Sequence, residues 1–417
     1  MTLYEDLLWR GLLKDVSNDA QAKKLLDQEK SRFYCGFDPT GASLTVGHLV
    51  QVIRSMLLQK YGHTPIILIG GATGLIGDPR QTSERKLLTL EESLINAEKI
   101  KTQISRFLDP KDTIYVNNYD WIKHIDMISF LRDYGKFFNI NYMLAKDTVQ
   151  RRLDIGISYT EFSYMIIQAI DFLHLYETMD CKIQFGGSDQ WGNITSGLEL
   201  IRKKCGDQHE ALGLSSPLLL KSDGSKFGKS ESGALWLDKD LTTPYEIYQY
   251  FLNVSDEDVL NYLKTLTLLE KSEIEAIYEK HEAQKELRIG QRALAESVCE
   301  LIHGNKALEE ALKVSDAIFT GSYEALDQDA FKMLAHILES ISVNGDQTVV
   351  DVLVLSGLAS SKREARTFIQ SHAVSINGQK IDDDQAKLDG ITPYYDTFMV
   401  LRRGKKKVAI LILPQKD

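Results

Sequence analysis

The sequence predicts an α/β protein with a doubly wound parallel sheet, followed by an α-helical domain and a small α+β domain. Three observations support this order. Apolar strand-like runs alternate with helix-like segments through the first half of the chain, as in parallel sheets covered by helices. From about residue 240 to about residue 320 the pattern is helical, without a convincing strand. Beyond residue 349, short helices and strands return.

The elements of the first half are apolar runs that end at glycines or polar turns. YCGF reads as a buried strand, and LVQVIRSMLLQKYG as an amphipathic helix that ends at its glycine. PIILIG and KIQFGG are further strands that run directly into glycine-rich turns. In order, the expected elements are strand 34–37, helix 49–62, strand 65–70, helix 90–107, strand 113–118 and strand 182–187.

The last part of the chain predicts its own small fold. Helices are expected at 349–357 and 361–370, a strand with an Asn377–Gly378 turn at 374–378, and further strands within 395–413. The mixed, polar segment before it reads as a linker. The expected division is a Rossmann-like domain at 1–225, a loop region at 226–240, a helical domain at 241–325, a linker at 326–348 and a C-terminal domain at 349–417.

Composition excludes several classes of protein. The chain of 417 residues has 43% hydrophobic and 26% charged residues, and no run approaches the roughly 18–20 apolar residues of a membrane span. No signal peptide is expected at the start, and four scattered cysteines without a CxxC pair fit a reducing cytoplasm and no structural metal. The net charge is −10, yet residues 349–417 carry 11 Lys and Arg against 8 Asp and Glu, which suggests that this part binds a polyanion.

One helix predicts a polar pocket. In EFSYMIIQAIDFLHLYE (161–177), Tyr164, Gln168 and Asp171 share one face, whereas the other faces are almost wholly apolar. A solvent-facing stripe is the ordinary interpretation of such spacing. Here the helix should be buried, so the stripe should face an internal cavity. Asp171 should then meet a cation or a hydroxyl donor, because a buried unpaired carboxylate is unfavourable.

Two turns and one loop add to this pocket. GGATGLIGDP (70–79) and FGGSDQWGN (185–193) each follow a strand with small residues and an aspartate, and neither matches the dinucleotide or phosphate-loop motifs. Tight βα turns alone would explain them about equally well. KSDGSKFGKSESG (221–233) places Lys226 and Lys229 in a flexible loop, which suits triphosphate binding only if a nucleotide site exists elsewhere.

Five motifs together resemble one family over essentially the whole chain. YCGFDPTGASL, GDP, YxxxQAxD, GGSDQWGN and KFGKS occur in the order of the bacterial-type tyrosyl-tRNA synthetases, which are class I aminoacyl-tRNA synthetases. KFGKS resembles the family's mobile KMSKS loop, TVGH its HIGH signature, and the end of the chain a small RNA-binding domain. The resemblance implies that tyrosine and ATP form tyrosyl-adenylate and pyrophosphate, and that tyrosine passes to the terminal ribose of tRNA(Tyr). It also implies Mg²⁺ with the ATP, a cytoplasmic setting without membrane contact, and a homodimer.

The same resemblance assigns site residues. For tyrosine it implies Tyr34 and Asp171 at the phenol, Asp78, Tyr164 and Gln168 at the ammonium, and Gln190 near the carboxylate. For ATP it implies Cys35, Gly36, Asp38, Thr40, Gly47, His48, Gly187, Asp189, Lys226 and Lys229. The catalytic set is Thr40, Thr45, His48, Arg85, Lys226, Lys229 and Ser230. For tRNA, charge and position favour Lys362, Arg363, Arg366, Arg402, Arg403, Lys405, Lys406 and Lys407.

The chain departs from the family pattern at two places. Thr45 replaces the first histidine of the signature, and PRQTSERK after Asp78 lacks the usual lysine, leaving Arg80, Arg85 and Lys86 as candidate cations, of which Arg85 is preferred. Two alternatives therefore stay open. One is a catalytically weak paralogue that serves as an RNA-binding module. The other is a tryptophanyl-tRNA synthetase, which Tyr34 and Asp171 disfavour because they suit a phenol better than an indole.

Overall fold

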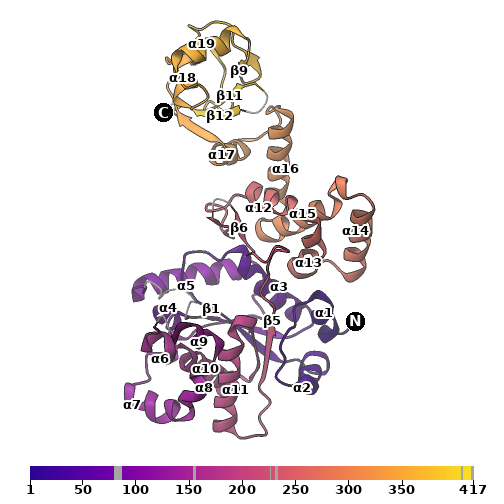
Figure 1. Cartoon of the computed structure of the whole chain (residues 1–417), viewed down its shortest axis with the longest axis vertical. Helices are drawn as coiled ribbons and strands as arrows, with labels where there is room; N and C mark the ends of the chain where they lie inside the picture. Colours follow the sequence, from indigo (N-terminus) through magenta and orange to yellow (C-terminus); the bar gives the residue numbers. More distant parts are fainter. Residues whose placement is uncertain (79–86, 154–155, 226, 231–232, 405–406, 415–417) are drawn as a thin grey trace. The chain divides into compact units, whose positions relative to one another are not determined.

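The computed structural model describes residues 1–78, 87–153, 156–225, 227–230, 233–404 and 407–414 (Figure 1). The chain divides into two compact units. The first comprises Met1–Leu241 and Val254–Leu294, and the second comprises Thr242–Asn253 and Ala295–Asp417. Among the described residues, none of the helices has both the length and the apolar character to cross a membrane.

A parallel sheet of five strands forms the centre of the first unit, in the order β3-β2-β1-β4-β5. This confirms the predicted doubly wound α/β fold. Its strands are β1 (Arg32–Phe37), β2 (Thr64–Ile69), β3 (Ile114–Asn117), β4 (Cys181–Gly187) and β5 (Leu212–Ser216). Four of them coincide with the predicted strands. The fifth, β5, was not predicted, because LGLSS has neither an apolar run nor a clear alternation.

Helices surround this sheet. They are α1 (Leu3–Arg10), α2 (Asp19–Lys23), α3 (Val46–Lys60), α4 (Thr73–Ile76), α5 (Leu90–Ile104), α6 (Tyr119–Ile122), α7 (Met127–Ser129), α8 (Ile140–Leu144), α9 (Asp147–Leu153), α10 (Tyr159–Met179) and α11 (Trp191–Cys205). A short antiparallel pair, β6 (Lys229–Ser230) and β7 (Gly233–Ala234), follows. The helices α10 and α11 pack against each other and against β4. The sheet and these two helices position the site.

The helical region is divided differently from the expected domain at 241–325. Its helices are α12 (Pro244–Leu252), α13 (Asp256–Leu266), α14 (Lys271–Ala283), α15 (Ile289–His303) and α16 (Asn305–Thr320). The first unit includes α13 and α14, because buried Arg10 on α1 donates hydrogen bonds to the carbonyl oxygens of Lys264, Thr267 and Leu269. The second unit includes α12 and α16, which pack together.

The second unit also contains a mixed sheet of five strands, in the order β10-β9-β11-β12-β8. Its elements are α17 (Gln328–Ile337), β8 (Glu339–Ser342), α18 (Val349–Leu355), α19 (Lys362–Gln370), β9 (Val374–Ile376), β10 (Gln379–Lys380), β11 (Phe398–Arg403) and β12 (Lys407–Ile412). Apolar side chains of α18, α19 and the sheet form its core.

Residues 326–348, expected as a linker, are instead part of this folded unit. β8 pairs in parallel with β12, and α17 buries Ala330, Phe331 and Leu334. The Phe331 ring stacks on Tyr394 and Phe398, with centroid distances of 4.7 and 5.6 Å. The apolar face of α17 is short and flanked by polar residues, so its sequence looks like that of a linker.

Phe331→Ala should destabilise the second unit by about 3–5 kcal/mol, the usual effect when a fully buried phenylalanine is truncated. Phe319→Ala is the matched control, because Phe319 on α16 is 90% exposed. Chemical unfolding of the full chain, followed by far-UV circular dichroism, measures both. Equal midpoints for the two variants would contradict the packing of α17 against the second sheet.

Candidate active site

A cavity of about 240 Å³ opens at the carboxyl ends of β1 and β4, next to α10. Ligands of parallel α/β sheets bind at this edge, where the strand ends leave a crevice. Many of the residues singled out in the sequence line it. They are Tyr34, Gly36, Asp38, Thr40, His48, Asp78, Tyr164, Gln168, Asp171, Asp189 and Gln190. The structure therefore brings four of the five sequence motifs together, all except KFGKS.

The polar stripe of α10 faces this cavity, as predicted. Ser158 caps the helix by accepting a hydrogen bond from the backbone N–H of Glu161. Most of its side chains are buried, including the apolar faces and Tyr164 and Asp171 of the stripe. Tyr164, Gln168 and Asp171 all line the cavity, so a ligand there meets the whole stripe.

Asp171 lies in the wall of the cavity with two nitrogen donors. Asn118 Nδ2 donates to one carboxylate oxygen at 3.0 Å and Trp121 Nε1 to the other at 2.9 Å. The sequence-based expectation of a cation or hydroxyl donor is thus corrected: an amide and an indole serve instead. Burial raises the pKa of Asp171 to about 7, although both hydrogen bonds act to lower it.

Tyr34 presents an unpartnered hydroxyl group to the end of the cavity that holds Asp171. Its hydroxyl is buried and has no hydrogen-bond partner among the described residues. The ring packs on Phe172 at a centroid distance of 5.4 Å. Burial raises the pKa of this hydroxyl well above its ordinary value, so it stays protonated. A ligand with a hydroxyl group could therefore pair with both Tyr34 and Asp171.

Hydrogen bonds connect Asp171 to the turns after β1 and β2. Tyr164 Oη donates to Asp38 Oδ2 at 2.8 Å, and Thr73 Oγ1 donates to Asp38 Oδ1 at 2.7 Å. Asn118 Nδ2 in turn donates to Thr73 Oγ1 at 3.1 Å. Gly70 must be glycine for this arrangement, since a Cβ atom there would come within 2.2 Å of Asp38 Oδ1.

A second carboxylate cluster lies around Asp78. Gln190 Nε2 donates to Asp78 Oδ2 at 2.7 Å, and Asn193 Nδ2 donates to Gln168 Oε1 at 2.9 Å and Gln190 Oε1 at 3.1 Å. Burial, together with Asp38 and Asp189, raises the pKa of Asp78 to about 6, although the hydrogen bonds from Gln190 and from Asn193 Nδ2, 3.4 Å from Asp78 Oδ1, act to lower it. At neutral pH Asp78 is mainly ionised and can bind a cation.

His48 lies at the start of α3 with a fixed tautomer. The backbone N–H of Thr45 donates to His48 Nδ1 at 3.1 Å, and Thr45 Oγ1 lies 2.9 Å from the same atom. Because a backbone N–H can only donate, Nδ1 is the acceptor and the ring proton lies on Nε2. The ring therefore accepts at Nδ1 and is a neutral donor at Nε2. Thr45 itself contacts His48 and is not among the cavity-lining residues.

Several predicted site residues lie behind or beside the cavity wall. The thiol of Cys35 is buried and contacts Gln51 Oε1 at 3.1 Å, and Gly187 ends β4 next to the lining residue Gly186. Gly228 and Leu235, on either side of the KFGKS serine, lie against the start of α3. A Cβ atom on Gly228 would lie 3.2 Å from the backbone nitrogen of Gly47, and Val46 N donates to Leu235 O. Lys229 and Ser230 are placed by their backbone in β6, whereas Arg85 and Lys226 lie outside the described residues.

The predicted RNA contacts in the second unit differ in their surroundings. Lys362 pairs with Asp351 at 2.7 Å, Arg366 with Asp384 at 3.4 Å, and Arg403 donates to Leu358 O. Arg402 packs against Gly321 at the end of α16. Arg363 and Lys407 are exposed and have no ion pair within the described part of the chain. Lys405 and Lys406 fall in a segment outside that part.

Sequence patterns did not reveal the groups that orient the carboxylates. Asn118 and Trp121 lie in and after the turn that follows β3, and Asn193 lies on α11. The only available signals were the strand end at 113–118 and the asparagine inside GGSDQWGN. Among the described residues, no group of three or more His, Cys, Asp or Glu side chains is arranged to hold a metal ion.

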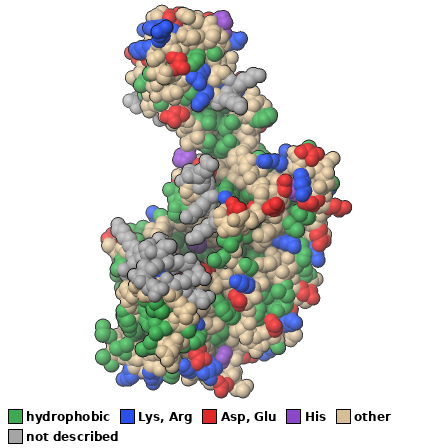
Figure 2. Space-filling model, in the orientation of Figure 1, with side chains coloured by type: hydrophobic (Ala, Val, Ile, Leu, Met, Phe, Trp, Pro, Cys, Tyr) green, Lys and Arg blue, Asp and Glu red, His purple; other side chains and the backbone are tan. Residues whose placement is uncertain are grey.

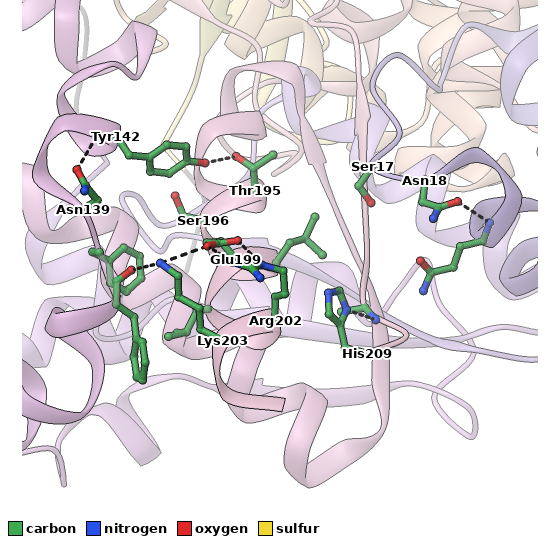
Figure 3. Close-up of a pocket in the computed structure, with 16 residues that line it drawn as sticks. Ser17, Asn18, Asn139, Tyr142, Thr195, Ser196, Glu199, Arg202, Lys203 and His209 are labelled. Atoms are coloured by element: carbon green, nitrogen blue, oxygen red, sulfur yellow. Dashed lines mark hydrogen bonds and ion pairs between the residues drawn. The ribbon is translucent and has the colours of Figure 1, made fainter. Parts of the chain in front are cut away.

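A larger cavity of about 690 Å³ lies elsewhere in the first unit (Figure 3). None of the predicted site residues lines it. Its charged side chains engage one another, with Arg202 Nε donating to Glu199 at 2.8 Å and Lys203 3.2 Å from the same carboxylate. Tyr142 donates to Thr195 at its other end. The smaller, polar cavity at the sheet edge is therefore the candidate active site.

Comparisons with known proteins agree with this site. Residues 26–320 match the family described as tRNA synthetases class I (W and Y). The tyrosine–tRNA ligase of Onion yellows phytoplasma (strain OY-M) is 51% identical over 413 residues, which cover 99% of this chain and 100% of that protein. The chain belongs to the tyrosine–tRNA ligase family. Tyrosine–tRNA ligase 1 of Bacillus subtilis (strain 168) is 50% identical, covering 97% of this chain and 98% of that protein.

Two further findings concern the parts of the molecule. Residues 330–411 match the SYY-like C-terminal domain of tyrosine–tRNA ligases, which includes most of the segment expected as a linker. A C-terminally truncated mitochondrial tyrosyl-tRNA synthetase of Aspergillus nidulans has a TM-score of 0.67 at 30% identity, covering 76% of this chain and 94% of that one. A tryptophanyl-tRNA synthetase of Encephalitozoon cuniculi shares the fold, with a TM-score of 0.56 at 14% identity. The match covers 78% of this chain and 89% of that one. The main interpretation of the sequence, a tyrosine–tRNA ligase fold and family, is confirmed.

Proposed function

We propose that this member of the tyrosine–tRNA ligase family activates L-tyrosine with ATP and then transfers the tyrosyl group to the 3′-terminal ribose of tRNA(Tyr). The observation that carries the proposal is the pair formed by Asp171 and the unpartnered Tyr34 hydroxyl at one end of the cavity. A site built to pair with a phenol hydroxyl leaves buried groups unpaired when phenylalanine enters, so it rejects that analogue.

The amino group of the substrate binds at the opposite end of the polar stripe. Asp78 accepts the ammonium, with Tyr164 and Gln168 beside it, and Gln190 lies near the substrate carboxylate. This assignment rests on the ionised Asp78, whose pKa of about 6 leaves it charged at neutral pH. Tyrosine then lies along α10 from Asp171 to Asp78, with its carboxylate towards the nucleotide.

ATP takes the half of the site at the ends of β1 and β4. Cys35, Gly187 and Asp189 contact the ribose, with Gly36 and Asp38 nearby, and Thr40, Gly47 and His48 face the phosphates. Attack by the tyrosine carboxylate on the α-phosphate needs placement and charge stabilisation rather than a general base. The neutral His48 Nε2–H is a suitable donor for that purpose. Arg85, Lys226, Lys229 and Ser230 close over the pyrophosphate, and Thr45 acts through His48.

Three further parts of the proposal concern partners and setting. Mg²⁺ enters with ATP, because this ion is usually bound through substrate phosphates.

A second copy of the chain covers apolar side chains that are exposed on α7, α8 and the start of α10, so the protein is a homodimer. These side chains include Met127, Ile128, Ile140 and Tyr159, each at least 65% exposed. Figure 2 shows hydrophobic side chains gathered on the part of the first unit where Figure 1 places α7. The cytoplasm is the expected compartment.

The proposal predicts pyrophosphate exchange into ATP that depends on tyrosine. The purified chain is assayed with tyrosine, tryptophan and phenylalanine in separate reactions, each with Mg²⁺ and ATP. Exchange with tyrosine alone is expected. Exchange only with tryptophan would show that the amino-acid assignment is wrong, and binding of tRNA without any exchange would indicate a catalytically weak RNA-binding paralogue.

Trp121→Phe should make tyrosine binding depend more strongly on pH. Removal of the indole donor raises the pKa of Asp171 above about 7, so more of it is protonated at neutral pH and accepts a weaker, uncharged hydrogen bond from the phenol. The KM for tyrosine should rise about 10-fold at pH 7 and recover in part near pH 8.5, because a hydrogen bond to a charged group contributes roughly 1.5–3 kcal/mol.

Trp9→Phe is the control for this variant, since Trp9 contacts Lys264 and Lys271 and does not line the cavity. Its KM should follow the wild-type pH profile. A Trp121→Phe profile that coincides with that of the wild type would mean that Asp171 does not bind the phenol.

The combined change Arg363→Ala and Lys407→Ala should weaken tRNA binding without changing tyrosine activation. Removing one phosphate contact makes the dependence of log K on log salt shallower by about 0.7–0.9. Lys332→Ala is the control, because Lys332 already pairs with Asp329 on α17. Filter binding of tRNA(Tyr) at several salt concentrations measures the slopes. An unchanged slope in the double variant would exclude both residues from the RNA contact.

A further inference from the structure

An arginine lies buried beneath the nucleotide half of the site. Arg54 projects from α3 and is 1% exposed. Its Nη1 donates to Ser216 Oγ at 2.9 Å and to Gly186 O at 3.2 Å. Its Nη2 donates to Phe185 O at 3.0 Å and lies 3.5 Å from Cys35 Sγ. The side chain therefore joins β1, β4 and β5 at one point.

The partners of this guanidinium are unusual for a buried cation. They are two backbone carbonyl oxygens, a hydroxyl and a thiol, none of which is a carboxylate. The Arg54 Cζ lies 3.7 Å from the centroid of the Phe185 ring, which adds a cation–π contact. Burial lowers the pKa of Arg54 and raises that of the Cys35 thiol, and the contact between the two groups opposes both shifts.

These partners belong to the nucleotide half of the proposed site. Phe185 and Gly186 line the cavity and come directly before the turn that carries Asp189, and Cys35 follows Tyr34 in β1. The tyrosine half depends on other contacts, from α10 and from the Asn118 and Trp121 donors. A shift of Arg54 would therefore move one half of the cavity more than the other.

We propose that Arg54 is a positioning residue for ATP. Its planar, forked guanidinium group fixes the end of β4 and the Cys35 thiol beneath the nucleotide. This inference rests on the proposed function. The fork matters because its donors point in fixed directions to Phe185 O, Gly186 O and Ser216 Oγ at once, which a lysine ammonium on its flexible stem cannot reproduce.

The positive charge of Arg54 also serves this half of the site. Asp38, Asp78, Asp171 and Asp189 line the cavity, so it is acidic before a polyanionic nucleotide enters. A cation behind the backbone of Phe185 and Gly186 offsets part of that charge without occupying space in the cavity.

Steady-state pyrophosphate exchange with Arg54→Met and Arg54→Lys tests the proposal. Methionine keeps much of the volume and removes every donor, whereas lysine keeps the charge and removes the fork. For both variants kcat/KM for ATP should fall by about 10- to 100-fold, as expected when groups that hold a reactant are slightly misplaced. The KM for tyrosine should change less than about threefold, because the tyrosine half keeps its own contacts. Lysine should recover only part of the activity.

Arg10→Met is the matched control. Arg10 is also buried and donates to three backbone carbonyls, but it pairs with Asp6 and joins α1 to the end of α13 and the segment after it. Thermal unfolding of all variants measures the destabilisation that they share. Arg10→Met should lower the melting temperature without a selective effect on ATP.

The outcomes distinguish a failure of this inference from a failure of the proposed function. A wild-type chain without tyrosine-dependent exchange would refute the proposed function itself. With an active wild type, values of kcat/KM for ATP in Arg54→Lys and Arg54→Met equal to that of the wild type would overturn the role of Arg54. The role would also be overturned if kcat/KM fell equally for ATP and for tyrosine, and by the same factor as in Arg10→Met at an equal loss of melting temperature. If Arg54→Met does not fold, Arg54→Lys decides alone.

Discussion

The candidate site depends on a carboxylate held inside an apolar helix. Asp171 is 2% exposed, and burial of an ionisable group without partners would be strongly unfavourable. The protein meets this constraint with two nitrogen donors, Asn118 and Trp121, both from the segment that follows β3. The position of that segment is therefore tied to α10. Burial raises the pKa of this carboxyl group to about 7, and the two uncharged donors offset only part of that shift, so the group can still pair with a ligand hydroxyl.

From Asp171 the same hydrogen-bond network extends through the rest of the cavity. Asn118 donates a hydrogen bond to Thr73, Thr73 donates to Asp38, and Asp38 also accepts from Tyr164 on α10. The turns after three parallel strands are thus fixed to one helix. In the proposed function, this acidic wall binds the ammonium of an amino acid, whereas the start of α3, His48 and the buried Arg54 serve a nucleotide.

Much of this was predictable from the sequence, and the reasons for the failures are physical. Strands β1 to β4 are apolar runs, and the stripe on α10 has helical spacing, so both were found. β5 is short and rich in small residues, and β8 pairs with a strand far along the chain, so local pattern carries no signal for either. Asn118, Trp121 and Arg54 act through contacts between distant segments. Their residue types fit a turn or an amphipathic helix equally well, and only the packing reveals their roles.

A crystal structure of the full chain with bound L-tyrosine would test the two carboxylate assignments most directly. The phenol oxygen is expected within hydrogen-bond distance of both Asp171 and Tyr34, with the ammonium in contact with Asp78. Tyrosine bound in the reverse direction, with its ammonium at Asp171, would contradict the assignment of the two carboxylates. Tyrosine bound outside the cavity at the ends of β1 and β4 would contradict the site itself.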